Sequence, residues 1–338
     1  MPPSRPQTAS SESLSSWIRR SLDDDPIDAF TLPGGRAEPR GPGLLELIPD
    51  APAVEAPAGV ISVGIHGNET APIELLQRCL KALGAGETSV GAPTLLVLGS
   101  LEAIRRDVRF IDTNLNRLFR RDLEETGAEP ERARTLMGAI DAFFARYPGR
   151  ARLHYDLHTA IRDSRYPRFA VEPYADAVTP PQHWAWLAAA DIQAVLHQHR
   201  HSWTFSHYTK HYHGAAAFTL ELGRARPFGH NDLAPLAPMG RLLLALLAGQ
   251  PPRRSDPQRM TFLRVEHELM RRSEAFRLAF ADDIPNFTEF APGSLLAEDG
   301  EHGATHVGEV PLAVVFPNAN VELGARAALL ARPVAPPA

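Results

Sequence analysis

A histidine and a carboxylate stand three residues apart in the stretch GIHGNET, residues 64–70. These are His66 and Glu69, and a second histidine of interest, His158, lies far along the chain in the stretch DLHTA. Two histidines and one glutamate form the ligand set of catalytic zinc sites that keep one coordination position open. A His-x-x-Glu pair alone is weak, because a glutamate can simply cap a helix. The surrounding strand, glycines and helix favour a zinc-dependent hydrolase.

A second carboxylate, Glu221, lies inside the apolar stretch FTLELG. Burying a carboxylate in an apolar strand is costly unless it is paired or functional. A zinc hydrolase needs a carboxylate that takes a proton from water and later gives it to the leaving amine. We therefore interpret Glu221 as the general base. The alternative is a glutamate on the exposed face of an edge strand.

Arginine and asparagine side chains recur in the stretch RFIDTNLNR, residues 109–117. Arginine binds a carboxylate through two parallel hydrogen bonds, and asparagine adds a directional amide. Next to a zinc site, this stretch suits an anionic substrate. By itself it is equally typical of a polar loop that contains ion pairs.

Alternating strands and helices must position these residues, which predicts an α/β fold with a mixed sheet flanked by helices. The pattern predicts strands at 60–65, 94–98, 153–157 and 216–222, and helices at 70–83, 131–147, 184–196 and 242–247. Ligands gather at the carboxyl ends of such strands, where His66 and His158 both stand. The period of two puts Asp156 on the same strand face as His158, so Asp156 is either an outer partner of that ligand or a structural residue.

Composition suggests three parts. Residues 1–40 are rich in Ser, Pro and Asp and are expected to be a poorly ordered N-terminal extension. Residues 41–257 carry the candidate zinc residues and form the expected catalytic domain. After a Gly-Gln-Pro-Pro stretch, residues 258–338 contain short strand-like runs and are expected to form a smaller β-rich C-terminal domain.

The overall charge excludes some functional classes. The net charge of -5 over 338 residues is too mild to indicate a nucleic-acid partner or a membrane surface. No apolar run is long enough to span a bilayer, so the cytoplasm is the expected location. The single cysteine, Cys79, rules out an intramolecular disulfide, and its helical spacing from Leu75 and Leu76 indicates a buried core residue rather than a nucleophile. A homo-oligomer is compatible with the sequence.

The motifs together resemble the succinylglutamate desuccinylase/aspartoacylase family, within the zinc carboxypeptidase-like superfamily. The resemblance runs from about residue 44 to residue 330 and is carried by these stretches: 64–72, 112–118, 156–162, 219–223, 226–229, 231–233, 286–288 and 316–321. It implies a zinc carboxypeptidase-like mixed sheet and one Zn²⁺ ion per chain. Residues 1–40 lie outside it.

The family resemblance also implies individual roles. It assigns the zinc ion to His66, Glu69 and His158, the acid/base to Glu221, polarisation of the carbonyl to Arg109, and binding of a substrate carboxylate to Asn116 and Arg117.

One departure from the family pattern bears on the substrate. Aspartoacylases carry a carboxylate-binding arginine about ten residues before the catalytic glutamate, and here the matching position is His211. This difference argues against N-acetylaspartate and leaves Lys210, His211 or His213 as replacements. The resemblance of the extended motifs to the desuccinylase branch of the family instead implies hydrolysis of N-succinyl-L-glutamate to succinate and L-glutamate, the last step of arginine catabolism by the succinyltransferase pathway.

Rival interpretations remain open. A related zinc deacylase would act on another N-acyl amino acid, a zinc carboxypeptidase would remove C-terminal residues, and an anion-binding module would hold no metal. Several histidines precede Glu221, and we interpret them as solvent-facing or pocket-lining rather than as a second metal site, because their spacing is irregular and no carboxylate lies among them: His197, His199, His201, His207, His211 and His213.

Overall fold

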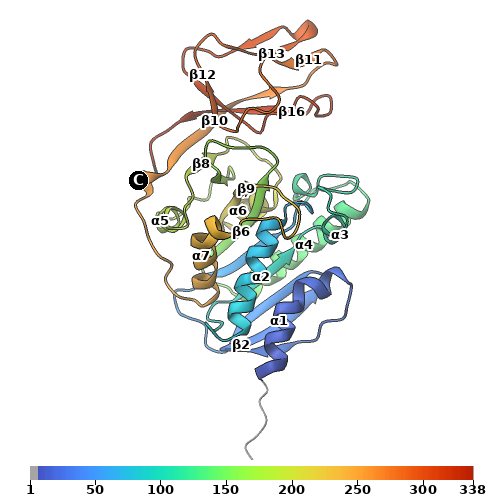
Figure 1. The fold of residues 1–338 in the computed structure, drawn as a ribbon, viewed down its shortest axis with the longest axis vertical. Coiled ribbons are helices and arrows are strands. Elements are labelled where there is room, and N and C mark those ends of the chain that lie inside the picture. Colours follow the sequence, from blue (N-terminus) through green and yellow to red (C-terminus); the bar gives the residue numbers. More distant parts are fainter. Residues whose placement is uncertain (1–6, 338) are drawn as a thin grey trace, which may run out of the picture.

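The structure is a computed structural model that describes residues 7–337. A large sheet runs through the molecule in the order β1-β2-β3-β5-β4-β6-β9-β7-β8-β10-β16-β15-β12, and a second sheet has the order β11-β13-β14. Helices flank the first part of the large sheet, and the C-terminal strands lie at one end of the molecule (Figure 1). The predicted mixed α/β sheet with a β-rich C-terminal part is therefore confirmed.

Four parallel strands at the centre of the large sheet position the candidate site. They are β5 (Thr94–Leu98), β4 (Ala58–Val63), β6 (Arg152–Ala160) and β9 (Ala216–Arg224), each hydrogen-bonded to the next. Their burial on both faces explains the continuous apolar runs in the sequence. Because they are parallel, their carboxyl ends meet at one edge of the sheet.

The remaining strands extend this centre on both sides. The antiparallel strands β1, β2 and β3 pair beside β5, while β7 and β8 follow β9. Their bounds, with those of the C-terminal strands, are β1 (Phe30–Leu32), β2 (Gly35–Gly41), β3 (Leu44–Pro49), β7 (Arg168–Glu172), β8 (Ala194–His197), β10 (Thr261–Met270), β11 (Phe276–Leu278), β12 (Thr288–Phe290), β13 (Leu295–Asp299), β14 (Ala304–His306), β15 (Leu312–Val315) and β16 (Arg326–Pro333).

The helices follow the strands that they connect. Their bounds are α1 (Gln7–Leu22), α2 (Thr70–Gly84), α3 (Leu101–Arg105), α4 (Ala128–Arg146), α5 (Gln182–Ala189), α6 (Phe205–His213) and α7 (Ala237–Leu247), with 3₁₀ turns at Leu115–Arg117, Ala234–Leu236, Pro257–Arg259 and Gly300–His302. Among the described residues, no helix has the length and apolar character needed to cross a membrane.

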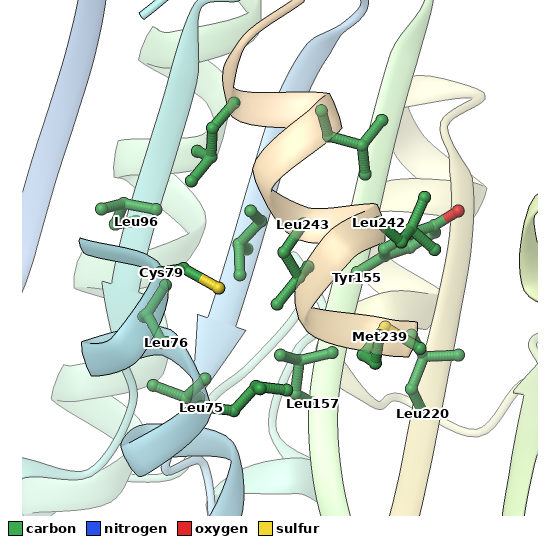
Figure 2. Packing of buried hydrophobic residues seen from close by; sticks show 14 of the residues in the cluster. Leu75, Leu76, Cys79, Leu96, Tyr155, Leu157, Leu220, Met239, Leu242 and Leu243 are labelled. Carbon is green, nitrogen blue, oxygen red and sulfur yellow. The ribbon is translucent and has the colours of Figure 1, made fainter. Parts of the chain in front are cut away.

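Helices α2 and α7 pack together over one face of the central strands. Figure 2 shows Cys79 of α2 and Leu243 of α7 beside Leu157 of β6 and Leu220 of β9, all of them buried. Full burial of each leucine side chain stabilises the fold by roughly 2 kcal/mol. Burial also raises the pKa of the Cys79 thiol to about 12, so the prediction of a core cysteine is confirmed. A second apolar cluster fills the other face, under α4 and α6.

The N-terminal prediction is wrong for the part of residues 1–40 that the structure describes. Residues 7–22 form α1, which packs on α2, and β1 and β2 join the edge of the large sheet. Leu14, Trp17 and Ile18 are buried, at the i, i+3, i+4 spacing of a helix face. Serine-rich composition concealed this stripe. Residues 1–6 lie outside the described part.

The helix predicted at 184–196 is also shorter than expected. Helix α5 ends at Ala189, Asp191 takes a left-handed φ of +64°, and residues from Ala194 form β8. Strand β8 gains backbone hydrogen bonds from neighbours on both sides, β7 and β10. That tertiary pairing outweighs the helical pattern of the sequence.

Candidate active site

Two glycines shape the loop that carries His66. Gly64 has a φ of +68°, a conformation that favours glycine. A Cβ atom on Gly67 would lie 2.1 Å from the backbone carbonyl carbon of Ala103, so only glycine fits against α3 there. The backbone N–H of Gly67 also donates to the carbonyl of Arg109, at 3.2 Å. His66 therefore lies between two positions, Gly64 and Gly67, that favour glycine over any other residue.

The carboxylate of Glu69 lies between two histidine rings. Nδ1 of His66 is 2.8 Å from Oε1 of Glu69, and Nδ1 of His158 is 2.8 Å from Oε2. All three side chains are buried. The chain thus brings together the three residues that the sequence suggested as metal ligands. His66 and Glu69 lie in the loop between β4 and α2, whereas His158 lies within β6.

The opposite nitrogens of both rings have partners of their own. Nε2 of His66 is 3.1 Å from Oδ1 of Asn114, and Nε2 of His158 is 2.9 Å from Oδ2 of Asp156. When Nε2–H donates to these acceptors, Nδ1 of each ring is free to bind a metal ion, which is the usual arrangement around metal-bound histidines. The group His66, Glu69 and His158 therefore fits a metal ion.

The protonation of the two rings is consistent with that fit. Burial lowers the pKa of His66 to about 4, so its ring is unprotonated at neutral pH, as a metal ligand must be. Burial also disfavours a charged His158, but Asp156 and Glu69 outweigh burial and raise the pKa of His158 well above its usual value. A metal ion would displace that proton, and its positive charge would replace that of the imidazolium as the partner of the two carboxylates.

A buried polar chain holds Asp156 in turn. The hydroxyl of Ser62 donates to Oδ1 of Asp156 at 2.6 Å and lies 2.8 Å from Nε2 of His154. Nδ1 of His154 is 2.9 Å from the hydroxyl of Thr209 on α6. The predicted alternation is confirmed, because His154, Asp156 and His158 share one face of β6. The chain ties the orientation of His158 to α6.

Glu221 lies directly beside His158, as its register partner on the neighbouring strand β9. Its side chain is buried, and Oε2 has no hydrogen-bond partner among the described residues. Burial and the nearby charge of Glu69 raise the pKa of Glu221 to about 7, against the opposing effects of His158 and Arg109. A carboxylate with this pKa can accept and release a proton at neutral pH.

Arg109, Asn116 and Arg117, the other predicted site residues, differ in how close they lie to the three candidate metal ligands. Nη1 of Arg109 donates to Oε1 of Glu69 at 2.7 Å, so Arg109 adjoins the metal group. Oδ1 of Asn116 accepts from the backbone N–H of Phe205 at 2.9 Å. Arg117 is solvent-exposed, and its Nη1 donates to the backbone carbonyl of Asn116 at 2.7 Å. Desolvation of the guanidinium, with repulsion from Arg326 and Arg109, lowers the pKa of Arg117 to about 10, which leaves it charged at neutral pH.

The structure also separates the three candidates for the missing arginine. Lys210 is buried, and its Nζ donates to Glu172 at 3.0 Å and to Thr179 at 2.7 Å. Nε2 of His213 is 2.7 Å from Oδ1 of Asp141. Both are thus engaged elsewhere, whereas the ring of His211 lies against the rings of other histidines.

Sequence reasoning missed Asn114 and Ser62. Asn114 is a partner of His66, and its Oδ1 also accepts from the backbone N–H of Asn116 at 3.0 Å. The signal for Ser62 was a lone hydroxyl inside an apolar strand, which needs a buried partner. No comparable signal identified Asn114, because its contact with His66 depends on how the 109–117 loop folds back.

Comparison with known proteins identifies the family. The family model of the succinylglutamate desuccinylase/aspartoacylase catalytic domain matches residues 55–247, and the AstE/AspA barrel-sandwich hybrid domain matches residues 258–334. The succinylglutamate desuccinylase of Serratia proteamaculans is 45% identical over 294 residues, covering 85% of this chain and 88% of the relative. That of Pseudomonas paraeruginosa is 44% identical, covering 90% and 92%.

A solved structure leads to the same grouping. The crystal structure of a succinylglutamate desuccinylase from Vibrio parahaemolyticus superposes with a TM-score of 0.87 at 34% identity, covering 94% of this chain and 95% of that one. The similarity extends over both the strands that carry the metal group and the C-terminal strands. This chain belongs to the succinylglutamate desuccinylase/aspartoacylase family.

Proposed function

We propose that this chain hydrolyses N-succinyl-L-glutamate to succinate and L-glutamate, as a zinc-dependent enzyme of the cytoplasm. Residues 41–257 would form the catalytic domain and residues 258–338 the smaller β-rich domain. Relatives named succinylglutamate desuccinylase, 42–45% identical over 85–90% of the chain, support the substrate. The single observation that carries the chemistry is the buried carboxylate of Glu221 beside His158, whose Oε2 has no hydrogen-bond partner among the described residues.

One zinc ion held by His66, Glu69 and His158 would polarise the amide carbonyl and make a water molecule more acidic. Glu221 accepts the proton of the attacking water at its unpartnered oxygen as the new C–O bond forms. It then gives that proton to the amide nitrogen while the C–N bond breaks, which releases L-glutamate and leaves succinate. A pKa near 7 allows both transfers at neutral pH.

Arginines supply the remaining charge. Arg109 is already at the metal group, and its guanidinium would donate to the oxyanion that develops on the carbonyl oxygen. The substrate carries three carboxylates, so Arg117, which stays charged and exposed, would bind one of them with help from the amide of Asn116. Oδ1 of Asn116 already accepts from the backbone N–H of Phe205. The side-chain N–H₂ of Asn116 is therefore the group that would donate to a substrate carboxylate.

Glu221→Gln tests the proposal. The substitution preserves shape but cannot accept a proton, so kcat should fall by about 10²- to 10⁴-fold while the zinc content per chain is unchanged. Glu298→Gln on β13, a half-exposed glutamate in the C-terminal part, is the matched control and should retain activity. Near-normal turnover by Glu221→Gln would remove it as the base.

The substrate is tested separately. N-succinyl-L-glutamate, N-acetyl-L-aspartate and a dipeptide should be compared as substrates of the same zinc-loaded preparation. We expect kcat/KM to be highest for N-succinyl-L-glutamate. A preference for either of the other two would indicate an aspartoacylase-like enzyme or a carboxypeptidase with the same catalytic groups.

A further inference from the structure

A second group of three imidazoles lies apart from the metal group described above. His207 and His211 stand one turn apart on α6, and His201 belongs to the loop between β8 and α6. One ring nitrogen from each residue lies within 4.8 Å of those of the other two. The closest pair, Nδ1 of His201 and Nε2 of His207, is 2.8 Å apart.

The loop that carries His201 is held in place from several sides. Trp203 has a φ of +53°, an unusual backbone conformation for tryptophan, and its carbonyl accepts from the N–H of Phe119 at 3.1 Å. The ring of Trp203 stacks on that of His201 with centroids 5.2 Å apart, and Tyr174 meets the same ring edge-on at 5.5 Å. The imidazole of His201 is therefore positioned over α6 before any ligand arrives.

The rings of His207 and His211 favour the unprotonated form. His207 is fully buried, and burial together with His201 and His211 lowers its pKa to about 3. Burial and His201 also lower the pKa of His211, against the opposing effect of Asp176. Neutral imidazoles keep a free lone pair, which is what a metal ion requires. Nε2 of His207 is the nitrogen that faces His201, and the other ring nitrogen, Nδ1, has no hydrogen-bond partner among the described residues.

We propose that His201, His207 and His211 bind a divalent transition-metal ion such as Zn²⁺, Co²⁺ or Ni²⁺. Imidazole is a good ligand for all three ions. Metal–nitrogen bonds of about 2.0–2.1 Å in a tetrahedral site separate the ligand nitrogens by roughly 3.3 Å. That separation falls between the closest nitrogen pair, 2.8 Å, and the 4.8 Å limit of the group, so small side-chain rotations are sufficient.

This site is independent of the proposed catalytic zinc and changes two expectations from the sequence. Irregular spacing led us to expect pocket-lining histidines, but the loop at Trp203 brings His201 back to a pair of histidines with regular i, i+4 spacing. The chain would then bind two metal ions instead of one. Because its three ligands are neutral, we expect this site to bind the ion more weakly than the group that contains the Glu69 carboxylate.

Metal stoichiometry tests the proposal on the full-length protein. Metal-free protein is titrated with Co²⁺ and followed by calorimetry and by the visible absorption of the bound ion. We expect two equivalents for the native chain, one for His211→Gln and one for His158→Ala, with the weaker binding event absent only from His211→Gln. His211 is exposed, so this variant should fold, which circular dichroism checks.

Two controls make the outcome decisive. His213→Gln removes a neighbouring histidine of α6 that pairs with Asp141, and it should keep both equivalents. One equivalent in the native chain, or an unchanged second equivalent in His211→Gln, would overturn the proposal. Loss of the tighter equivalent in His158→Ala tests the catalytic zinc alone, so failure of either site is recognised separately.

Discussion

Asp156 offers the sharpest test of how the proposed metal site is built. Its two carboxylate oxygens accept from Nε2 of His158 at 2.9 Å and from the hydroxyl of Ser62 at 2.6 Å. In Asp156→Asn, one oxygen becomes an amide N–H₂ that would face a donor. A lost hydrogen bond to a charged group costs about 1.5–3 kcal/mol, which corresponds to a roughly 10- to 100-fold change in an equilibrium constant. We therefore expect Asp156→Asn to weaken zinc binding at the Glu69 group by about that factor, the usual effect of removing an outer partner of a metal ligand.

The affinity is measured by competition between metal-free protein and a chromophoric zinc chelator at pH 7. His158→Ala identifies which binding event belongs to the Glu69 group. Asp299→Asn is the matched control, since Asp299 is also buried and accepts from Ser273 and from the backbone of Arg272, but lies in the C-terminal part. A folded Asp156→Asn variant that binds zinc within about twofold of the native chain would refute the reasoning.

Three further predictions concern binding and stability. Arg117→Ala should raise KM for N-succinyl-L-glutamate by about tenfold or more, whereas Arg120→Ala, whose arginine pairs with Glu125, should not; equal KM values would exclude Arg117 from substrate binding. Despite burial, His197, Lys210 and Thr179 lower the pKa of Glu172 to about 2, so its stabilising effect is present above pH 5 and is lost as pH falls toward 2. The difference in unfolding free energy between the native chain and Glu172→Gln should shrink by about 2 kcal/mol from pH 6 to pH 3 in urea titrations, and a constant difference would contradict this. Trp17→Ala should lower the free energy of unfolding by about 3–5 kcal/mol, because Trp17 is buried in the interface of α1; a loss below 1 kcal/mol would show that α1 adds little stability.

Much of the candidate site could be predicted because the features that point to it are local. His66 follows the end of β4 at Val63, and His158 lies near the carboxyl end of β6, which ends at Ala160. A parallel sheet brings such ends together. Glu221 stood out for a similar reason, as a carboxylate within an apolar strand. Recognising these features requires only the period of a strand and the cost of burying a charge. Both can be judged from a few neighbouring residues.

Long-range contacts were less accessible. The ion pair between Arg109 and Glu69 depends on a loop that folds back across forty residues, and no spacing rule predicts it. Strand β8 was mistaken for helix because its apolar residues satisfy both periods over a short run. Helix α1 was overlooked because its stabilisation comes from packing on α2, which local composition does not reveal.

The continuity of the large sheet has a mechanical consequence. Strand β10 is hydrogen-bonded to β8 through four residue pairs, from Thr261 with Ala194 to Arg264 with His197. A hinge between the strands that carry the candidate site and the C-terminal strands would have to break this ladder, and breaking it would leave buried backbone N–H and C=O groups without partners. The two ends of the molecule in Figure 1 therefore behave as one stiff body. Substrate entry and product release would then depend on loop movements at the carboxyl edge of the sheet, and their rates should be insensitive to crosslinks that join β8 to β10.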